Sequence, residues 1–497
     1  MSSCYTTVTA SVVQVASQGA LGAMIDNLKT RQIDIFASAY YTTRPFAHGM
    51  EREATDQPIY ATRRNQIKNK FEITRSFDLI YQLYLVIDLP GIRTFVNTDA
   101  VQLSEANADA GNLAHYTNGV AAALIREVHL CMGGHSLSKL TGEQIYLYEE
   151  LAGRPGKRLE SSVGKGESAL TLAKRSAKAQ RLFLPMYFFF CATRGSVSSA
   201  LNLIGAQFQK ATIDLSVNSL MSVVEFGGSD HCISRNSVEG ARVYVTDVVS
   251  TESMTSPVRA SGELAVPDTT QGLLSEYEGA RLTLDVLGIT LNEADRQQFS
   301  TKDRMALMDE VTVIENVGAQ SLRTASTTID LTDYAKNLVY ELQIAARLRK
   351  VRALNKEDGN SPYVAQGPMR FGGRCEPLTG LSADPLASLS LTISGQQRTQ
   401  AGLESAYYNQ VTPYMHHSTV PSQKGIYSMP FSLYPEDWNV PDSYANASKL
   451  DSMRLQIGLP EDVVSEQAQN GGVDLLVFAH QFNVLVEQKG MKARFFV

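Results

Sequence analysis

Glycine and lysine residues between Gly156 and Ala169 come closest to a nucleotide-binding pattern. Gly164-Lys-Gly166 followed by Ala169 matches the G-x-G-x-x-A spacing of a dinucleotide-binding turn. That turn needs a buried strand before it, to direct a helix N-terminus at the phosphates, and the residues that precede Gly164 are polar. Gly156-Lys157 lacks the upstream glycine that a phosphate-binding loop requires. We therefore predict a loop here, without a cofactor.

A histidine pair and a carboxylate pair are the other residues whose types could perform chemistry. His416 and His417 are adjacent, and because neighbours on a strand point to opposite faces they cannot easily share a metal ion. We predict a turn after Pro413-Tyr414 instead. The segment Glu436-Asp437-Trp438 suggests a glycosidase acid pair, but nothing in the sequence supplies a partner carboxylate at the required separation. We predict no catalytic residue, no metal ligand and no enzyme activity.

Charge, cysteine content and hydropathy exclude further classes of protein. The 497 residues carry 45 Lys and Arg against 51 Asp and Glu, so bulk positive charge cannot hold the chain on nucleic acid. The five scattered cysteines form no C-x-x-C pair, and we expect reduced thiols in a cytosolic setting. The N-terminus lacks a secretory signal, and the longest apolar run, 182–192, is shorter than the ~20 residues of a spanning helix.

Two basic clusters and one sequon are further surface features. Residues 154–181 hold eight basic side chains against two acidic ones, and a second cluster contains Arg347, Arg349, Lys350 and Arg352. Each cluster could meet nucleic acid, anionic lipid or an acidic protein, although a solvated surface is the more common role. Asn446-Ala-Ser448 is a formal glycosylation sequon, which we expect to be unused without a signal peptide.

Alternation of apolar and polar residues predicts the elements. It occurs in five segments: 211–217, 281–286, 336–344, 389–394 and 452–457. A strand with one buried and one solvent-exposed face is typical of an antiparallel sheet. Strands of a parallel sheet are buried on both faces and would be apolar throughout. Helical patterns are short: Asn292 is expected to cap a helix over 293–299 and Ser300 one that extends to Met308, and 167–181 is a third candidate.

The chain also contains a weak internal repeat. Leu130–His135 resembles Leu391–Gln396, each a strand that runs into a glycine turn. In each half an aromatic strand with a proline follows, 182–188 and 426–432, and then a strictly alternating strand. The spacing of about 250 residues suits one sandwich domain per half, so we predict two similar all-β domains in tandem. Two long connections are expected to form elaborated outer loops: 218–279 and 353–385.

Longer motifs allow a comparison with known families. The clearest is 128–151, in which a strand, a Gly-Gly turn and a helix follow one another. Others follow along the chain: 71–80 with Leu89-Pro90, 182–190, 200–208, 284–299, 413–451 and 482–491. In this order they resemble the major capsid proteins of nucleocytoplasmic large DNA viruses, the double jelly-roll type. The resemblance makes 284–299 the opening of the second roll. Phe77 stands where the family usually has Gly, Asn202 where Pro is common, and Asp295 where Glu is common.

The resemblance implies two tandem antiparallel eight-stranded jelly rolls with long loops and a few short helices. We expect an N-terminal arm over 1–32, a first roll over 33–225 and a second roll over 226–497, with an insertion near 218–279. Homotrimers would form pseudo-hexagonal capsomers of the icosahedral virion of a large double-stranded DNA virus, assembled in the host cytoplasm. Expected partners are neighbouring capsomers, minor capsid and penton proteins and an inner viral membrane, near which the arm would lie. Sequence-specific nucleic-acid binding is not expected.

Two alternatives stay open at this point. A minor or virophage-type capsid protein would have the same fold, and its copy number per particle would distinguish it. A lectin-like or carbohydrate-active β-sandwich protein would need aromatic side chains facing a sugar, and a single tryptophan in the chain argues against it.

Overall fold

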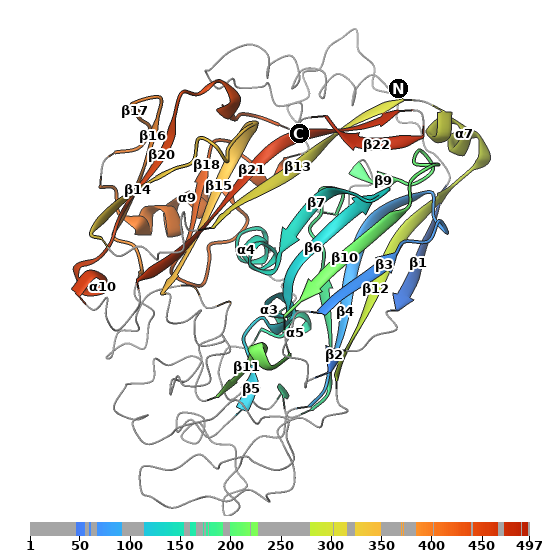
Figure 1. Ribbon diagram of the computed structural model, residues 1–497, viewed down its shortest axis with the longest axis horizontal. Helices are drawn as coiled ribbons and strands as arrows, with labels where there is room; N and C mark the ends of the chain where they lie inside the picture. Colours follow the sequence, from blue (N-terminus) through green and yellow to red (C-terminus); the bar gives the residue numbers. More distant parts are fainter. Residues whose placement is uncertain are drawn as a thin grey trace, which may run out of the picture.

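Two β-sandwich units lie side by side in the computed structural model of the chain (Figure 1). The structure describes residues 46–54, 59–60, 67–91, 114–153, 160–165, 172, 175–176, 178–191, 199–218, 220–226, 279–301, 303–315, 324–348, 369, 371, 384–400, 402–438, 441–465, 472–488 and 490–495. The expected arm over 1–32 and most of the two long connections lie outside these residues.

The first unit is built from two antiparallel sheets, with strand orders β1-β12-β4-β8 and β3-β10-β6-β7. Their bounds are β1 Phe46–Ala54, β3 Ile67–Glu72, β4 Leu79–Leu89, β6 Ile125–Met132, β7 His135–Thr141, β8 Gln180–Pro185, β10 Ala211–Val217 and β12 Gly279–Leu291. Short strands extend these sheets or pair apart from them: β2 (Ile59–Tyr60) on β12, β9 (Leu201–Asn202) on β4, and β5 (Ala114–Tyr116) with β11 (Val224–Phe226).

The second unit repeats this arrangement with the orders β13-β21-β15-β18 and β14-β20-β16-β17. Their bounds are β13 Arg304–Glu315, β14 Ser326–Asp330, β15 Leu338–Leu348, β16 Ser388–Ile393, β17 Gln396–Gln397, β18 Ile426–Pro430, β20 Met453–Gly458 and β21 Val473–Gln488. Two short strands are added: β19 (Ala445–Asn446) on β15 and β22 (Met491–Arg494) on β21.

The connectivity of both units is that of a jelly roll. When the main strands of each unit are counted in chain order, one sheet joins the first, eighth, third and sixth, and the other joins the second, seventh, fourth and fifth. Two packed four-strand sheets with this order define the eight-stranded jelly roll. The expected fold class, two tandem eight-stranded jelly rolls, is therefore confirmed within the described residues.

Strand pairing places the end of the first roll later than the expected boundary between 225 and 226. Strand β12 pairs with β1 and β4, so it is the eighth strand of the first roll and not the opening of the second. The alternation over 281–286 identified a strand correctly, but alternation carries no information about the partner strand. The second roll begins with β13.

Short helices lie at the edges of the rolls. Their bounds are α3 Val120–Leu124, α4 Gly142–Ala152, α5 Glu160–Val163, α7 Glu293–Thr301, α9 Thr412–His416 and α10 Glu461–Ser465, with single turns η2 Leu220–Val223, η5 Tyr407–Val411 (π-helical), η6 Pro435–Asp437 and η7 Ala447–Lys449. None of the helices in the described part of the chain is long and apolar enough to cross a membrane.

The helix predictions had mixed outcomes. Asn292 caps α7 as expected, since its Oδ1 accepts a hydrogen bond from the backbone N–H of Asp295 at 2.8 Å. The helix expected from Ser300 to Met308 is wrong, because Ser300 lies inside α7 and β13 follows. Pairing of β13 with β21 along its whole length overrides the helix propensity of Met, Ala and Leu. In the third candidate, Leu172, Arg175 and Ser176 are helical, but β8 already begins at Gln180.

The internal repeat is confirmed in its turns. Gly133-Gly134 joins β6 to β7, and Ser394-Gly395 joins β16 to β17. All four residues have positive φ, between 48° and 88°. This is the backbone of a two-residue type I′ hairpin turn, which favours glycine because a Cβ is strained there. The proline-containing strands also correspond, since β8 and β18 are the sixth strands of their rolls and both end at proline.

Apolar side chains on the inner faces of the strands form two buried clusters. The second cluster lies wholly within the second roll. The first fills the first roll and continues into the second through Tyr340 of β15 and Phe478 and Phe482 of β21, among others. The rings of Tyr340 and Phe482 stack with centroids 4.7 Å apart. The two rolls therefore share one apolar core rather than meeting only at a polar surface.

Phe77, one of the departures from the family pattern, lies over a pair of glycines. Gly49 of β1 and Gly288 of β12 are directly opposite each other in the sheet. A Cβ on Gly49 would come within 2.3 Å of the Phe77 ring, and a Cβ on Gly288 within 2.2 Å. The ring thus occupies the space that two missing side chains leave on the sheet.

Replacing Gly288 by Ala is expected to destabilise the first roll, because the added methyl group overlaps the Phe77 ring. Overpacking of this kind costs about 1–3 kcal/mol. Thermal unfolding followed by circular dichroism measures the loss. Adding Phe77→Gly to Gly288→Ala should remove most of the penalty, since the obstructing ring is gone. An equal penalty in both backgrounds would contradict this explanation.

Candidate assembly surface

One junction between the rolls joins helix α4 to the segment 417–423, which leads into β18. Thr419 donates its hydroxyl to the carbonyl oxygens of Glu150 and Leu151 at 2.7 and 2.8 Å, and its N–H bonds Leu151 at 3.0 Å. The backbone N–H and hydroxyl of Ser422 bond the Glu150 carboxylate at 3.1 and 2.8 Å. The Thr419 bonds satisfy carbonyl groups at the C-terminal end of α4, which have no partner within the helix.

Charged side chains reinforce this junction. Glu150 also accepts a bond from Lys165 at 2.8 Å, and the Lys165 ammonium lies 4.1 Å from the centroid of the Tyr146 ring. From the second roll, the buried Arg347 side chain reaches Glu143 of α4 at 3.3 Å. Burial raises the pKa of Glu150, but Lys165 and Ser422 outweigh it, so that its pKa is lowered. The carboxylate therefore stays charged and holds both rolls.

His417, the residue after α9, is buried between two carboxylates of the second roll. Its Nε2 lies 2.7 Å from Glu341 Oε1 of β15, and its Nδ1 lies 3.5 Å from Glu436 Oε1 of η6. Ser428 donates to Glu341 at 2.7 Å, and Ser418 donates its N–H and hydroxyl to Glu436, both at 2.6 Å. We call His417, Glu341 and Glu436 the histidine cluster.

The charges of the histidine cluster stabilise one another. Burial lowers the pKa of His417, but the two carboxylates raise it to about 9. Burial raises the pKa of Glu341, and His417, His480 and Ser428 together lower it to about 2. His480 of β21 lies 3.4 Å from Asp309 of β13, and its pKa is raised by Asp309 and Glu341 against the effect of burial. The cluster is thus charged over the neutral pH range.

Exposed apolar side chains gather beside this cluster, on η5, α9 and the turn before η6. We call them the apolar patch: Tyr407, Val411, Tyr414, Met415, Leu433 and Tyr434. Tyr414 is 79% exposed and Met415 61%. The two segments are joined because His416 Nδ1 lies 3.1 Å from the carbonyl oxygen of Leu433. Isolated apolar residues are normal on a surface, but a contiguous group indicates an interaction site.

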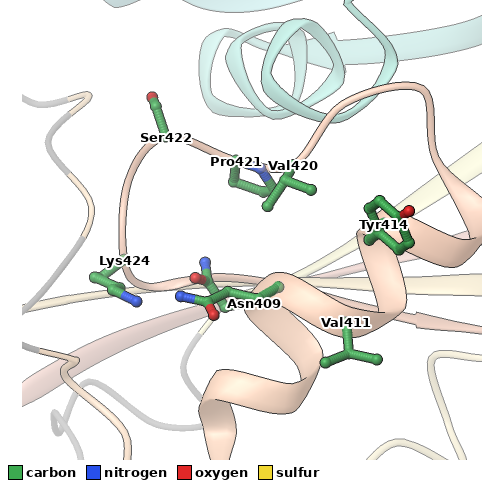
Figure 2. Close-up of a pocket in the computed structure, with 8 residues that line it drawn as sticks. Asn409, Val411, Tyr414, Val420, Pro421, Ser422 and Lys424 are labelled. Atoms are coloured by element: carbon green, nitrogen blue, oxygen red, sulfur yellow. The ribbon is translucent and has the colours of Figure 1, made fainter.

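A hollow of about 500 Å³ separates this patch from the junction segment (Figure 2). Val411 and Tyr414 line one side of it, and Val420, Pro421 and Lys424 line the other. A second hollow, of about 440 Å³, also borders η5 and shares Gln410 and Val411 with the first. The surface here is uneven, apolar and close to the contact between the rolls, which suits a protein partner better than a buried small molecule.

A second junction joins β9 and the following loop to the β21–β22 hairpin. The side-chain amide of Asn202 donates to Glu487 at 3.0 Å and to the carbonyl oxygen of Phe299 at 3.2 Å. Gln209 accepts from the backbone N–H of Lys492 at 2.7 Å and donates to its carbonyl oxygen at 3.3 Å. The N–H of Phe208 bonds Gly490 at 3.3 Å. Asn202, a departure from the family pattern, is therefore a contact between the rolls.

The residues considered for chemistry have structural partners. Gly164 ends α5 with φ of 80°, and Lys165 is paired at the first junction. His416 and His417 do diverge: the His417 side chain is 2% exposed between its two carboxylates, whereas His416 is half-buried and contacts the carbonyl oxygen of Leu433. Both oxygens of Glu436 are bound within the second roll, and Trp438 is buried. In the part of the chain that the structure describes, no group of three His, Cys, Asp or Glu residues is arranged to hold a metal ion.

The basic clusters and the sequon are only partly described. Lys165, Arg175, Lys178 and Arg181 are the described basic residues of the stretch 154–181, and Arg181 pairs with Asp88 at 2.6 Å. Arg347 is buried at the first junction, while Gly156-Lys157 and residues 349–352 lie outside the described residues. Asn446 of the sequon is buried and accepts a bond from Ser448 at 2.7 Å, so its amide is inaccessible to a glycosyltransferase in the folded chain.

Sequence reasoning missed the burial of His417, Lys492 and Arg347. His417 was grouped with its neighbour His416, and nothing in the local pattern indicates that only one of them faces Glu341. Lys492 lies on a strand that alternates, Met-Lys-Ala-Arg, with the charged residues on one face. Such alternation is typical of a polar face that lies in solvent, and here the packing of the second junction over β22 buries Lys492.

Comparison with known proteins places these features in a family. A model of the large eukaryotic DNA virus major capsid protein matches residues 295–493, and a model of the major capsid protein N-terminus matches residues 36–248. The major capsid protein of Phaeocystis pouchetii virus is 23% identical over 84% of this chain and 87% of its own length. Probable capsid protein 4 of Acanthamoeba polyphaga mimivirus is 23% identical over 31% of this chain, and the match spans 28% of that protein. The crystal structure of Vp54 of PBCV-1 has a TM-score of 0.61 at 17% identity, covers 93% of this chain and 100% of that one, and shows the shared fold.

The histidine cluster predicts a specific dependence of stability on pH. Because the folded-state pKa of His417 is raised from 6.5 to about 9, its contribution is fully present below pH 6.5 and is lost as the pH rises through about 9. The contribution of Glu341 is present above pH 4.5 and is lost as the pH falls toward about 2. Each contribution is on the order of a few kcal/mol.

His417→Asn and His416→Asn, measured by thermal unfolding from pH 6.5 to 9, form a matched pair. The stability gap between the unsubstituted chain and His417→Asn should be large at pH 6.5 and should narrow toward pH 9, because the unsubstituted chain then loses the same charge. His416→Asn should follow the unsubstituted chain at every pH, since His416 lies outside the cluster. A gap for His417→Asn that does not change with pH would contradict the assigned charge state.

Proposed function

Because this chain belongs to the family of large eukaryotic DNA virus major capsid proteins, we propose that three copies form a pseudo-hexagonal capsomer. Such capsomers would tile the icosahedral shell of a large double-stranded DNA virus. The observation that carries this proposal is the identical strand order of the two rolls. Three copies of a chain with two similar rolls present six similar units around one axis, which approximates a hexagon and lets identical blocks fill a closed shell.

The junctions between the rolls support this role. A three-fold ring closes only if each copy holds its two rolls at one fixed angle, since any variation would add up around the axis. Here one apolar cluster runs through both rolls, and polar bonds connect them at two separate places, α4 with 417–423 and β9 with β21–β22. The chain therefore acts as a rigid two-roll block.

The apolar patch is the contact that we propose between copies. The occupant of the patch would be a second copy of this chain. The patch borders the segment 417–423, which sets the angle between the rolls. The orientation of the patch is therefore fixed relative to both rolls, as a contact between copies in a closed ring requires. Six large apolar side chains can form the centre of an interface, with the long loops adding the remainder of the ~1,600 Å² or more that a stable contact buries.

The wider assembly is part of the same proposal. The protein would be made and assembled in the host cytoplasm, and in the virion its capsomers would contact one another, minor capsid proteins and penton proteins. The arm over 1–32 would lie at the base, toward an inner viral membrane. The role is structural, without catalysis and without sequence-specific binding of nucleic acid. Sugar binding by an isolated monomer is the competing function that the experiment below also tests.

Native mass spectrometry of the purified chain tests the trimer. We expect a species of three chain masses, and Tyr414→Asp combined with Leu433→Asp should shift it toward the monomer, because two buried carboxylates would oppose association. Met50→Asp is the matched control: Met50 is 60% exposed on β1, outside the patch, and its replacement should leave the trimer intact. All variants are first checked for folding by circular dichroism.

The possible outcomes separate the proposals. A monomeric unsubstituted chain that binds to a glycan array would overturn the capsomer and favour the lectin-like alternative. A trimer that resists the double substitution but dissociates with Met50→Asp would retain the capsomer and move the contact to the β1 side of the first roll.

A further inference from the structure

Lys492, Glu487 and Asn202 form a buried triad at the second junction. Glu487 and Lys492 are direct partners across the β21–β22 hairpin, and the Lys492 ammonium contacts Glu487 Oε1. The other oxygen of the same carboxylate, Oε2, accepts the side-chain amide of Asn202 from the first roll at 3.0 Å. One carboxylate thus holds an amine from one roll and an amide from the other.

The triad is shielded from water. Lys492 is 2% exposed, Asn202 3% and Glu487 7%. Burial lowers the pKa of Lys492. Glu487 opposes this effect, but the pKa of Lys492 stays below its usual value. A buried lysine with a lowered pKa exchanges its proton readily with a neighbouring carboxylate, and the neutral amine is a nucleophile.

The amide of Asn202 is held in a fixed orientation. Its carbonyl oxygen Oδ1 accepts the backbone N–H of Gly205 at 3.1 Å, and its nitrogen is held by Glu487 and by the carbonyl oxygen of Phe299. A Cβ on Gly205 would come within 2.6 Å of Nδ2, so only glycine fits against the amide. An N–H aimed at the amide oxygen is a donor placed where negative charge develops when a nucleophile adds to the amide carbon.

We propose that Lys492 and Asn202 form an intramolecular isopeptide bond, promoted by Glu487, which covalently joins the two rolls. Lysine and asparagine supply the two atoms that become bonded, the lysine Nζ and the asparagine Cγ. No oxidant, metal or cofactor is needed, because the reaction is a transfer of an acyl group from one nitrogen to another with release of ammonia.

The reaction conserves atoms and charge and returns Glu487 to its starting state. Glu487 takes a proton from the Lys492 ammonium, and the neutral amine adds to Cγ of Asn202, which places negative charge on Oδ1 facing the Gly205 N–H. The protonated Glu487 gives its proton to the leaving Nδ2 and accepts one from Nζ. The C–N bond to Nδ2 breaks, ammonia departs and takes up the remaining proton as ammonium, and Glu487 is a carboxylate again.

The surrounding contacts hold Lys492 and Asn202 on the two oxygens of one carboxylate and fix the backbone of Lys492 against the first roll. Gln209 of the first roll holds the backbone of Lys492 through both its N–H and its carbonyl group. The lysine side chain has four flexible bonds and can move from the carboxylate to the amide carbon while the backbone stays fixed. The bond would connect residues 202 and 492, far apart in the sequence, and so prevent the rolls from separating.

Mass spectrometry of the full-length chain tests this proposal. The folded chain should have a mass lower than its sequence mass by one ammonia, and complete proteolysis should yield a branched peptide that joins the segments around Asn202 and Lys492. Lys492→Arg, Asn202→Ala and Glu487→Gln should each have the full sequence mass and give no branched peptide. Lys210→Arg is the matched control, since Lys210 is an exposed lysine of the same region that pairs with Glu72, and it should retain the branch.

The unsubstituted chain decides the proposal without relying on any variant. A folded sample with the full sequence mass and no branched peptide, also after prolonged incubation at neutral pH, would overturn it and leave the triad as a buried ion pair only. A branch that forms at the same rate in folded Glu487→Gln would overturn the role of Glu487. Neither result bears on the trimer, which native mass spectrometry reads separately.

Discussion

Burial of one face of the sheet β13-β21-β15-β18 against the first roll is the constraint on which the rest of the molecule depends. Tyr340, Phe478 and Phe482 point from this sheet into the cluster that also fills the first roll, where β13 contacts β7. Apolar burial is worth roughly 25 cal/mol per Å², so an extended shared face outweighs any single polar bond at its margin. The rolls consequently behave as one unit, and every polar group that this contact covers must find a partner within the protein.

The polar groups at the margin follow from that requirement. An unpaired charge in such a place would cost several kcal/mol, whereas a pair with additional hydrogen bonds is tolerated and has one favoured geometry. Glu150 is held by Lys165 of the first roll and Ser422 of the second, and Glu487 by Lys492 of the second roll and Asn202 of the first. The apolar core supplies most of the affinity between the rolls, and the paired charges select the angle at which they meet. The same reasoning explains why the carboxylate at each junction binds one residue from the first roll and one from the second.

Much of the fold could be predicted from the sequence, because the alternation that marks a strand is local. The alternating segments 211–217 and 452–457 and the hairpin turns at Gly133 and Gly395 were recognisable for that reason. Partner choice is not local. Strand β12 alternates in the same way whichever roll it joins, and β13 has residues that also suit a helix until β21 pairs with it. The burial of His417 and Lys492 was equally beyond a local pattern, because it depends on what packs above each strand. The resemblance predicted the architecture, and the positions at which the chain departs from the family had to be explained by contacts.

Those departures show how a repeated fold can carry a specific assembly. The two rolls share strand order and turn geometry, yet corresponding residues make different contacts. Helix α4 faces the segment 417–423 of the second roll. Asn202 of β9 faces the β21–β22 hairpin, whereas Asn446, at the matching position of β19, bonds Ser448 within its own roll. Two identical rolls would be free to associate in more than one arrangement, including chains that never close. Unequal contacts leave a single arrangement of first roll against second. Phe77 makes a comparable change inside one roll, where its ring is accommodated because Gly49 and Gly288 leave space for it. In the proposed trimer, the similar folds of the two rolls would supply six similar corners, and their different contacts would fix the order in which first and second rolls alternate.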